Sequence, residues 1–239
     1  MIDVFYVLGT GSKWQNNEIR YSLRSLEKYG HNVGQVYVVG QKPSFISDKI
    51  KYIKAADIGT PATNHWYKVK RFFVETGIKR ACYMMDDIFF IKDVDLENYP
   101  YYCHGDLKKY TDISTNNYHR TITDTKLELE DENKPITNFE IHCPIIYEKD
   151  KFESLEQKFY KIKGRHRHFV GVRSYYCNMN GIKGITCDDM KIRKPHMNNW
   201  LERIKDNDCF STSDDAIKMG VGDWLIKKFP NPSKYEKTL

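Results

Sequence analysis

The sequence predicts an α/β fold built on a mainly parallel sheet flanked by helices. Short apolar, β-rich segments alternate with segments whose apolar residues recur at helical spacing, and glycines mark the junctions. Strands that alternate with helices in this way are typical of a parallel sheet. The chain has 239 residues, of which 40% are hydrophobic and 14% aromatic, so it can bury a core and is unlike disordered, collagen-like or coiled-coil chains.

The clearest alternation lies in residues 1–100. Residues 3–8 form a predicted strand that stops at the turn Gly9-Thr10-Gly11-Ser12, and residues 18–29 carry apolar side chains at helical spacing before Gly30. The other elements predicted in this half are a strand over 35–39, a helical stretch led by Pro43, a strand over 51–53, a helix over 63–76 and a strand over 80–85.

The pattern weakens beyond residue 95. The polar stretch 112–134 has no convincing periodicity, and we expect a long loop or lid there. The other expected elements are a short strand at 101–103, a strand-like run over 139–147, a helix over 149–162, short strands from residue 164, and helices around 214–219 and 223–228. No internal repeat and no linker rich in Pro, Gly or Ser divides the chain, which predicts a single domain over residues 1–239 with an accessory α+β half at its C-terminus.

Charge and cysteine usage set weaker limits. Lys and Arg number 38 against 32 Asp and Glu, and the resulting net charge of +6 permits a phosphate-bearing partner without requiring one. The basic clusters at 164–168 and 191–194 could bind a nucleic-acid backbone or an anionic acceptor, or could be solvated faces. Six scattered cysteines without a Cys-x-x-Cys pair favour reduced thiols and a cytoplasmic protein. With no signal-like N-terminus and no apolar run near the ~20 residues of a membrane helix, we expect no membrane span.

Asp86 and Asp87 directly follow the buried strand predicted over 80–85. In open α/β sheets, ligands bind outside the carboxyl ends of the strands, so this position favours a functional role over that of ordinary surface acids. Two carboxylates there can hold a hard divalent cation that also takes diphosphate oxygens, and Mg²⁺ and Mn²⁺ suit them equally. We expect one acid to be a direct metal ligand and the other to contact ribose, sugar or a metal-bound water.

Three further features are candidates for the same site. The glycine turn Gly9-Thr10-Gly11-Ser12 lets backbone N–H groups approach a phosphate, although an ordinary strand-to-helix turn can have the same sequence pattern. Arg20 and Arg24 share a helix face and could grip a diphosphate, or could instead pair with Glu18 or Glu27. His142, in a strand-like apolar run, could deprotonate an acceptor hydroxyl or could be a buried structural histidine.

Read in order, these segments resemble the Stealth family of capsular-polysaccharide phosphotransferases. The segments that carry the resemblance are Asp3-Val4-Phe5-Tyr6 through Gly11-Ser12-Lys13-Trp14, Ile19 to Tyr29, Val36 to Val39, Pro43, Asp86-Asp87, His142-Cys143-Pro144 with Phe152 and Phe159, and Phe229 to Glu236. They are distributed over nearly the whole chain, and the arginine-rich helix and the tail are the most specific. Members of this family look like glycosyltransferase-A folds and transfer sugar-1-phosphate from a nucleotide sugar to an acceptor hydroxyl.

The resemblance implies roles for residues of this chain. It makes Arg20, Arg24, Asp86, Asp87 and His142 candidates for one site, with His142, Asp87 and Arg24 as catalytic residues. It also implies that residues 1–100 hold the nucleotide sugar and the metal and that residues 101–239 hold the acceptor and close the site. The remaining donor-binding candidates are Gly9, Thr10, Gly11 and Ser12, with Arg173 as a phosphate contact and Ser233 or Lys234 closing the donor site.

Two other functions stay open on the sequence. A glycosyltransferase would move the sugar itself to a saccharide or to a hydroxylated base in modified DNA, and its DNA affinity would fall steeply with salt. A non-catalytic nucleotide or nucleic-acid binding module would show no metal-dependent consumption of a nucleotide sugar.

Overall fold

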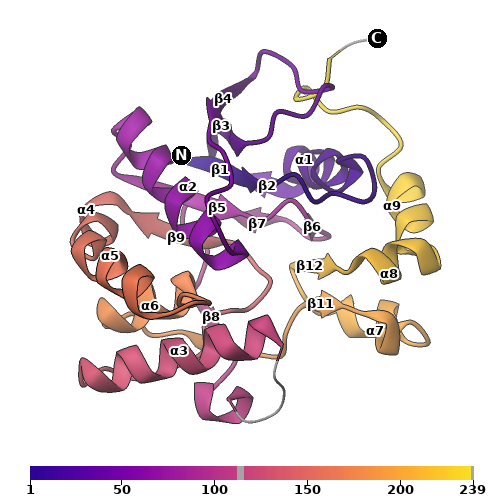
Figure 1. Ribbon diagram of the computed structural model, residues 1–239. Helices are drawn as coiled ribbons and strands as arrows, with labels where there is room; N and C mark the ends of the chain where they lie inside the picture. The colour runs from indigo at the N-terminus through magenta and orange to yellow at the C-terminus, as the bar shows by residue number, and fades with distance from the viewer. Residues whose placement is uncertain (112–115, 238–239) are drawn as a thin grey trace.

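The computed structural model describes residues 1–111 and 116–237, and within them a five-stranded central sheet with the order β4-β3-β1-β5-β9 (Figure 1). The first four strands in that order are parallel and β9 is antiparallel to β5. Their bounds are β1 Ile2–Leu8, β3 Val33–Gly40, β4 Ile50–Lys54, β5 Arg80–Met84 and β9 Ile145–Glu148. The predicted α/β class with a mainly parallel sheet is confirmed.

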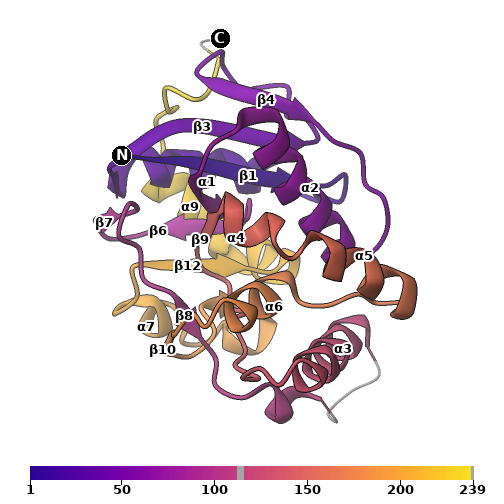
Figure 2. The same cartoon turned by 90° about the vertical axis from the view of Figure 1, so that its left-hand side faces the viewer.

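Helices cover both faces of this sheet, as Figures 1 and 2 show from two directions. The helix α1 (Asn17–Tyr29) packs on one face, where Leu23 and Leu26 meet Val4 and Tyr6 of β1. The opposite face is covered by α2 Pro61–Thr76, α4 Lys149–Glu153, α5 Glu156–Arg165 and α6 Val172–Met179. The chain thus has three layers, with the sheet in the middle.

The alternation of side chains along β1 explains this two-sided burial. Val4 and Tyr6 point to the α1 side, whereas Phe5 points to the α2 side and stacks on Phe72 with ring centroids 4.1 Å apart. All four side chains are fully buried. Burial of each such large side chain contributes about 2 to 3 kcal/mol to folding, so β1 anchors both layers.

Local signals in the sequence fix where α2 begins and ends. Thr60 caps the helix by accepting a hydrogen bond from the Thr63 N–H, and Pro61 occupies the first helical position. Gly77 ends the helix at φ 67°, a left-handed conformation that glycine adopts without strain. The first turn of α2 consequently lies at the end of the sheet where β1 stops.

Shorter strands attach the second half of the chain to the first. A three-stranded sheet joins β11 (Lys191–Ile192), β12 (Cys209–Thr212) and β6 (Ile88–Phe90) in that order. Two small parallel pairs are β2 (Gly30–His31) with β7 (Val94–Asp95), and β8 (Tyr102–Cys103) with β10 (Ile185–Thr186). The remaining helices, which include two short 3₁₀ segments and one π-helical turn, are Leu107–Tyr110, α3 Asn117–Asp131, Lys194–His196, α7 Trp200–Ile204, α8 Asp214–Ala216, Ile217–Val221 and α9 Gly222–Lys228.

Several expectations about single elements are wrong. The stretch led by Pro43 is not helical, because Ser47 and Phe45 form backbone hydrogen bonds with the C-terminal tail instead. The predicted helix over 149–162 is broken near Ser154 into α4 and α5. Of the run predicted over 139–147, only its end belongs to β9, since the carbonyls of Ile141 and Cys143 accept from the Arg173 side chain rather than from a neighbouring strand.

The expected loop over 112–134 contains the helix α3, while residues 112–115 lie outside the described part of the chain. The apolar stripe of α3 is narrow, since its buried positions include Ile122 and Leu129 but also Thr125 and Glu128. The two polar residues form hydrogen bonds, Thr125 with the Gly171 N–H and Glu128 with the side chains of Arg165 and His166 at the end of α5. A buried face that is half polar gives no helical hydropathy pattern. The helix α6 was also not predicted as a helix.

Every helix in the described part of the chain is too short or too polar to cross a lipid bilayer.

Candidate functional site

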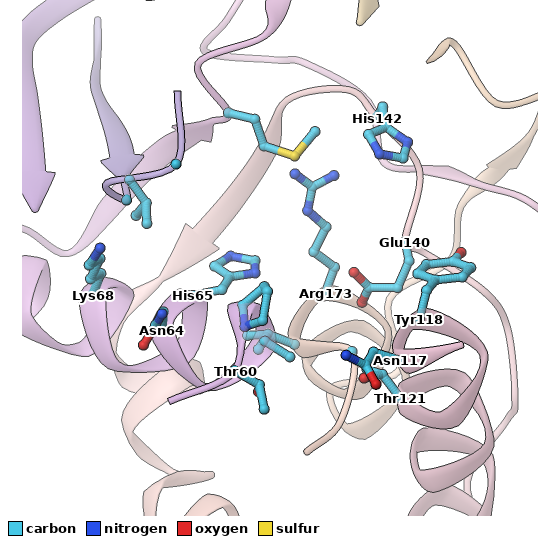
Figure 3. A pocket seen from close by; sticks show the side chains of 18 of the residues that line it. Thr60, Asn64, His65, Lys68, Asn117, Tyr118, Thr121, Glu140, His142 and Arg173 are labelled. Atoms are coloured by element: carbon cyan, nitrogen blue, oxygen red, sulfur yellow. The ribbon is translucent and has the colours of Figure 1, made fainter. Parts of the chain in front are cut away.

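A cavity of about 690 Å³ opens at the carboxyl ends of β1 and β5 (Figure 3). The loop after β1 forms one wall with Gly9, Thr10 and Gly11, and the first turns of α2, α3 and α6 form others. Asp86 and Asp87, directly after β5, line it as well. This is the edge of a parallel sheet at which α/β proteins bind ligands, and the volume suits a small molecule.

Asp86 and Asp87, the two acids that follow β5, differ in how they are held. Asp87 Oδ2 accepts hydrogen bonds from Ser211 Oγ at 2.8 Å and from Lys191 Nζ at 3.1 Å. Asp87 Oδ1 is buried and has no partner among the described residues. A buried carboxylate oxygen without a donor is costly, so this atom is placed to bind a cation or a donor that a ligand supplies.

The pKa values of the two carboxyls move apart. Burial, followed by the neighbouring charge of Asp87 and then that of Glu18, raises the pKa of Asp86 to about 7. Burial also acts to raise the pKa of Asp87, but Lys191, His142 and the Ser211 hydrogen bond outweigh it and hold that pKa below its usual range. Asp87 is therefore the carboxylate that stays ionised at neutral pH, and Asp86 is the one that gains or loses a proton.

Arg173 brings a buried positive charge into the same cavity. The side chain is 3% exposed, its Nη1 donates to the carbonyls of Ile141 and Cys143, and its guanidinium lies 5.1 Å from the centre of the Tyr83 ring. Nη2 is buried without a partner among the described residues. Figure 3 shows the guanidinium between the side chains of His65 and His142. An unpaired donor on a buried cation favours an anionic ligand.

The helix α2 contributes two basic side chains to the cavity, Lys68, which is buried, and His65, which is partly buried. Lys68 Nζ donates to the carbonyl of Leu8 and to Asp57 Oδ1, both at 2.5 Å. His65 stacks on Tyr83 with ring centroids 4.5 Å apart, and burial, then the charge of Arg173, lowers its pKa well below the usual value. His65 is accordingly neutral at pH 7 and acts as a polar, uncharged part of the wall.

The side chain of Glu140 lies at the start of α6, in close contact with Gly171. Its Oε1 accepts a hydrogen bond from the Ser174 N–H at 2.9 Å, which caps the helix. A Cβ on Gly171 would lie 2.6 Å from that same oxygen. A side chain at 171 would therefore displace the Glu140 carboxylate from this position.

His142 is positioned by an acid from a distant segment. Its Nδ1 lies 2.9 Å from Asp189 Oδ1, and the other oxygen of Asp189 accepts from Arg193 at 2.8 Å. Burial lowers the pKa of His142 even though Asp189 favours the charged form. An imidazole whose Nδ1 faces a carboxylate presents Nε2 to a ligand, which is the arrangement of a general base.

The structure brings together most, but not all, of the residues predicted for the site. Those that line the cavity are Gly9, Thr10, Gly11, Asp86, Asp87, His142 and Arg173. Ser12 does not line it, and its hydroxyl donates to Glu18 at 2.8 Å.

The other predicted donor-binding residues gather around the C-terminal tail, away from the residues that line the cavity. Arg24 forms a two-pronged pair with Glu236 at 2.7 and 2.8 Å, and Arg20 lies over the Phe45 ring, with its Nε 3.7 Å from Glu236. The Ser233 N–H donates to Glu236, and the Lys234 N–H to Glu27. Glu236 is thus the partner of both arginines, rather than Glu18 or Glu27, and a role for these residues in donor binding stays a prediction.

The sequence reasoning missed three residues that line the cavity, His65, Lys68 and Glu140, and also Asp189, which contacts His142. His65 and Lys68 could have been found, because the first turns of a helix that follows a parallel strand border the ligand-binding edge of the sheet. Asp189 gave no signal, since it lies in a segment without periodicity, 47 residues from the histidine that it contacts.

The fit of a divalent metal rests on Asp87 and Asp86. The described residues contain no group of three or more His, Cys, Asp or Glu side chains arranged to hold a metal ion. Asp87 nevertheless offers a buried oxygen without a partner, and Asp86 lies beside it. Carboxylate oxygens of this kind fit Mg²⁺ or Mn²⁺ where substrate phosphates and water supply the remaining ligands.

No protein-family model matches the chain, and a comparison with curated proteins gives no match. The resemblance to the Stealth family therefore stays an expectation from the sequence.

Proposed function

We propose that the protein is a metal-dependent transferase of glycosyltransferase-A type that moves sugar-1-phosphate from a nucleotide sugar to an acceptor hydroxyl. One observation carries the proposal: the same cavity at the carboxyl edge of the sheet holds the carboxylate of Asp87 and the buried guanidinium of Arg173, and one oxygen of the first and Nη2 of the second have no partner among the described residues. A nucleotide diphosphate with its divalent cation satisfies both, because the cation takes the carboxylate and the phosphates take the arginine.

The donor would lie across the cavity. The loop Gly9–Gly11 borders the end proposed for the nucleotide, and Arg173 contacts a phosphate. Asp87, with Asp86 beside it, would hold Mg²⁺ or Mn²⁺. That ion would neutralise charge that develops on the phosphates in the transition state, which is where most phosphoryl-transfer catalysis originates.

His142 has the geometry to move the proton. The acceptor hydroxyl would give its proton to Nε2 while its oxygen forms a bond to the β-phosphorus. The bond between that phosphorus and the bridging oxygen breaks, and the nucleoside monophosphate leaves with the electron pair. Asp189 holds the Nδ1 side of the ring and stabilises the imidazolium that results.

Identification of the released nucleotide tests this proposal directly. We would incubate the protein with a panel of nucleotide sugars, Mn²⁺ or Mg²⁺, and hydroxyl acceptors, and identify the nucleotide by mass spectrometry. Release of the monophosphate supports sugar-1-phosphate transfer. Release of the diphosphate means attack at the anomeric carbon, so that the protein is a glycosyltransferase with the same donor site.

The third function, a binding module, predicts a different result. No nucleotide sugar would be consumed with either metal, and Asp87→Ala would leave nucleotide binding unchanged.

A further inference from the structure

A second cavity of about 600 Å³ adjoins the proposed donor cavity. Tyr118 and Glu140 line both of them. Asp189 lines the second cavity and contacts His142, which lines the first. The proposed base therefore stands at the boundary between the two spaces, with its carboxylate partner in the wall of the second.

The charges of the second cavity do not suit a polyanion. Its charged lining residues among those the structure describes are two arginines and three carboxylates, namely Arg193, Arg203, Glu140, Asp188 and Asp189. With the histidines counted as neutral, this set carries a net negative charge. Burial lowers the pKa of the lining residue His196, in agreement with a neutral ring at pH 7. Phosphate groups would meet net repulsion here.

Three of the five Lys and Arg side chains in the basic clusters that could have bound nucleic acid form ion pairs within the protein. In the cluster 191–194, Lys191 pairs with Asp87 and Arg193 with Asp189. In the cluster 164–168, Arg165 pairs with Glu128. Cations neutralised in this way contribute little to the binding of a phosphate backbone.

The lining instead combines hydrogen-bonding groups with flat rings. His104 and Tyr110 stack with centroids 5.2 Å apart and an interplanar angle of 21°, and Tyr118 is 44% exposed. Aromatic rings offer an apolar face to the C–H side of a ligand, while carboxylates, arginines and imidazoles can bond hydroxyl groups. Such a mixture matches a ligand that has many hydroxyls and no charge.

We propose that the second cavity is the acceptor site and that the acceptor is an uncharged, polyhydroxylated molecule whose reacting hydroxyl reaches His142 past Tyr118 and Glu140. As an acceptor site it rests on the proposed transferase function, whereas the binding that it predicts can be measured without any donor. The inference also selects between the acceptors that the sequence left open, since it favours a saccharide over modified DNA.

The test uses saturation-transfer NMR and titration calorimetry on the intact protein. The probes are neutral trisaccharides (maltotriose, cellotriose and N,N′,N″-triacetylchitotriose) and a short DNA oligonucleotide, each without donor or metal. The variants are Asp188→Asn and Arg203→Gln, two exposed residues of the cavity wall, with Asp131→Asn as the matched control on the exposed end of α3. Thermal unfolding verifies that each variant folds.

We expect at least one trisaccharide to bind the native protein. Its affinity should fall about tenfold in each cavity variant, the loss expected for one hydrogen bond to a charged group, and should stay unchanged in Asp131→Asn. The inference is overturned if no trisaccharide binds, if the cavity variants bind it as the native protein does, or if DNA binds with an affinity that falls in Arg203→Gln.

Failure of the proposed function would look different. If the protein binds a trisaccharide through this cavity but consumes no nucleotide sugar, the saccharide site exists and the proposed transferase function is wrong. If it transfers sugar-1-phosphate to trisaccharides with the same acceptor KM in all variants, the transferase function holds and the acceptor binds elsewhere.

Discussion

Arg24 and Glu236 lie 212 positions apart in the chain and form a two-pronged ion pair, with Nε and Nη2 of the arginine 2.7 and 2.8 Å from the two carboxylate oxygens. The pair is nearly closed to solvent, at 10% and 6% side-chain exposure, and Arg24 Nη1 also donates to the Phe229 carbonyl. It ties the tail to α1, and it lies outside the proposed donor cavity.

We expect Arg24→Ala to act on stability. Removal of one partner leaves the Glu236 carboxylate buried without its cation, which should lower the free energy of unfolding by about 2 to 3 kcal/mol. Urea denaturation measures this change, with Lys49→Ala, an exposed lysine before β4, as the control. A loss of turnover in Arg24→Ala at unchanged stability would instead support the catalytic role that the resemblance implied.

Asp87→Asn should remove metal-dependent turnover. The amide keeps the size of the side chain and a hydrogen bond to Ser211, but it cannot supply the charged oxygen that a hard cation prefers. We expect Mn²⁺ affinity in the presence of a nucleoside diphosphate to fall at least tenfold and the rate by about 10² or more. Calorimetry and donor consumption measure the two effects. Asp93→Asn, an exposed acid beyond β6, is the control, and equal Mn²⁺ affinity in both variants would contradict the assignment.

Arg173→Lys should weaken the binding of a nucleoside diphosphate. Lysine keeps the charge but has a single nitrogen, which cannot occupy both the position of Nη1, against the two carbonyls, and that of Nη2. We expect a loss of affinity of about tenfold or more, measured by calorimetry. Arg71→Lys, at an exposed pair with Glu75 on α2, controls for the chemical change itself. Unchanged affinity in Arg173→Lys would remove this residue from the donor site.

Gly171→Ala tests the close contact with Glu140. The added Cβ would push the Glu140 carboxylate from its position at the start of α6, at a cost of about 1 to 2 kcal/mol in the free energy of unfolding. Because the cost comes from one pair, a double-mutant cycle with Glu140→Ala should be non-additive, with the second variant relieving most of the strain. Additive losses would show that the contact is not the cause.

His65 should make stability depend on pH. Its pKa in the folded protein is depressed, mainly by burial, while in the unfolded chain it stays near 6.5. The unfolded chain therefore takes up a proton first as the pH falls, so the contribution of His65 is complete above about pH 6.5 and declines below it, by at most about 1.4 kcal/mol per pH unit.

The measurement compares urea unfolding of the native protein and His65→Gln from about pH 7.5 to about pH 5, on both sides of the ordinary histidine pKa. The variant should lose stability less steeply below about pH 6.5 than the native protein. Identical slopes in the two proteins would contradict a depressed pKa for His65.

The sequence predicted those parts of the fold whose signals are local. The strand over 80–85 and the helix over 63–76 were recognisable because a buried strand is uniformly apolar and because Gly77 ends the helix. The same local logic placed Asp86 and Asp87 at the carboxyl edge of the sheet, where the structure has them. The helix α3 was not predicted, because its buried face includes Thr125 and Glu128, whose burial depends on partners far along the chain.

Partners that meet only in three dimensions were beyond the reach of sequence patterns. Lys191 belongs to a basic cluster that could have bound an outside anion or formed a solvated face, and in the structure it pairs with Asp87. Arg24 could have gripped a diphosphate or paired with Glu18 or Glu27, and in the structure it pairs with Glu236. Neither partner could be named from the sequence, because ion pairs between distant segments leave no periodic trace.

The hydrogen bonds that Lys191 and Ser211 donate to Asp87 have a consequence for the order of folding. The acid belongs to the first hundred residues, but the side chains that hold it come 104 and 124 positions later. Contacts of such long range form slowly, because a large loop must close first. During synthesis, the strands that form the sheet edge emerge well before Lys191 and Ser211. In the nascent chain, Asp87 is therefore exposed without the two side chains that later donate hydrogen bonds to it. Assembly of the contacts around Asp87 should therefore follow formation of the central sheet as a separate, later step.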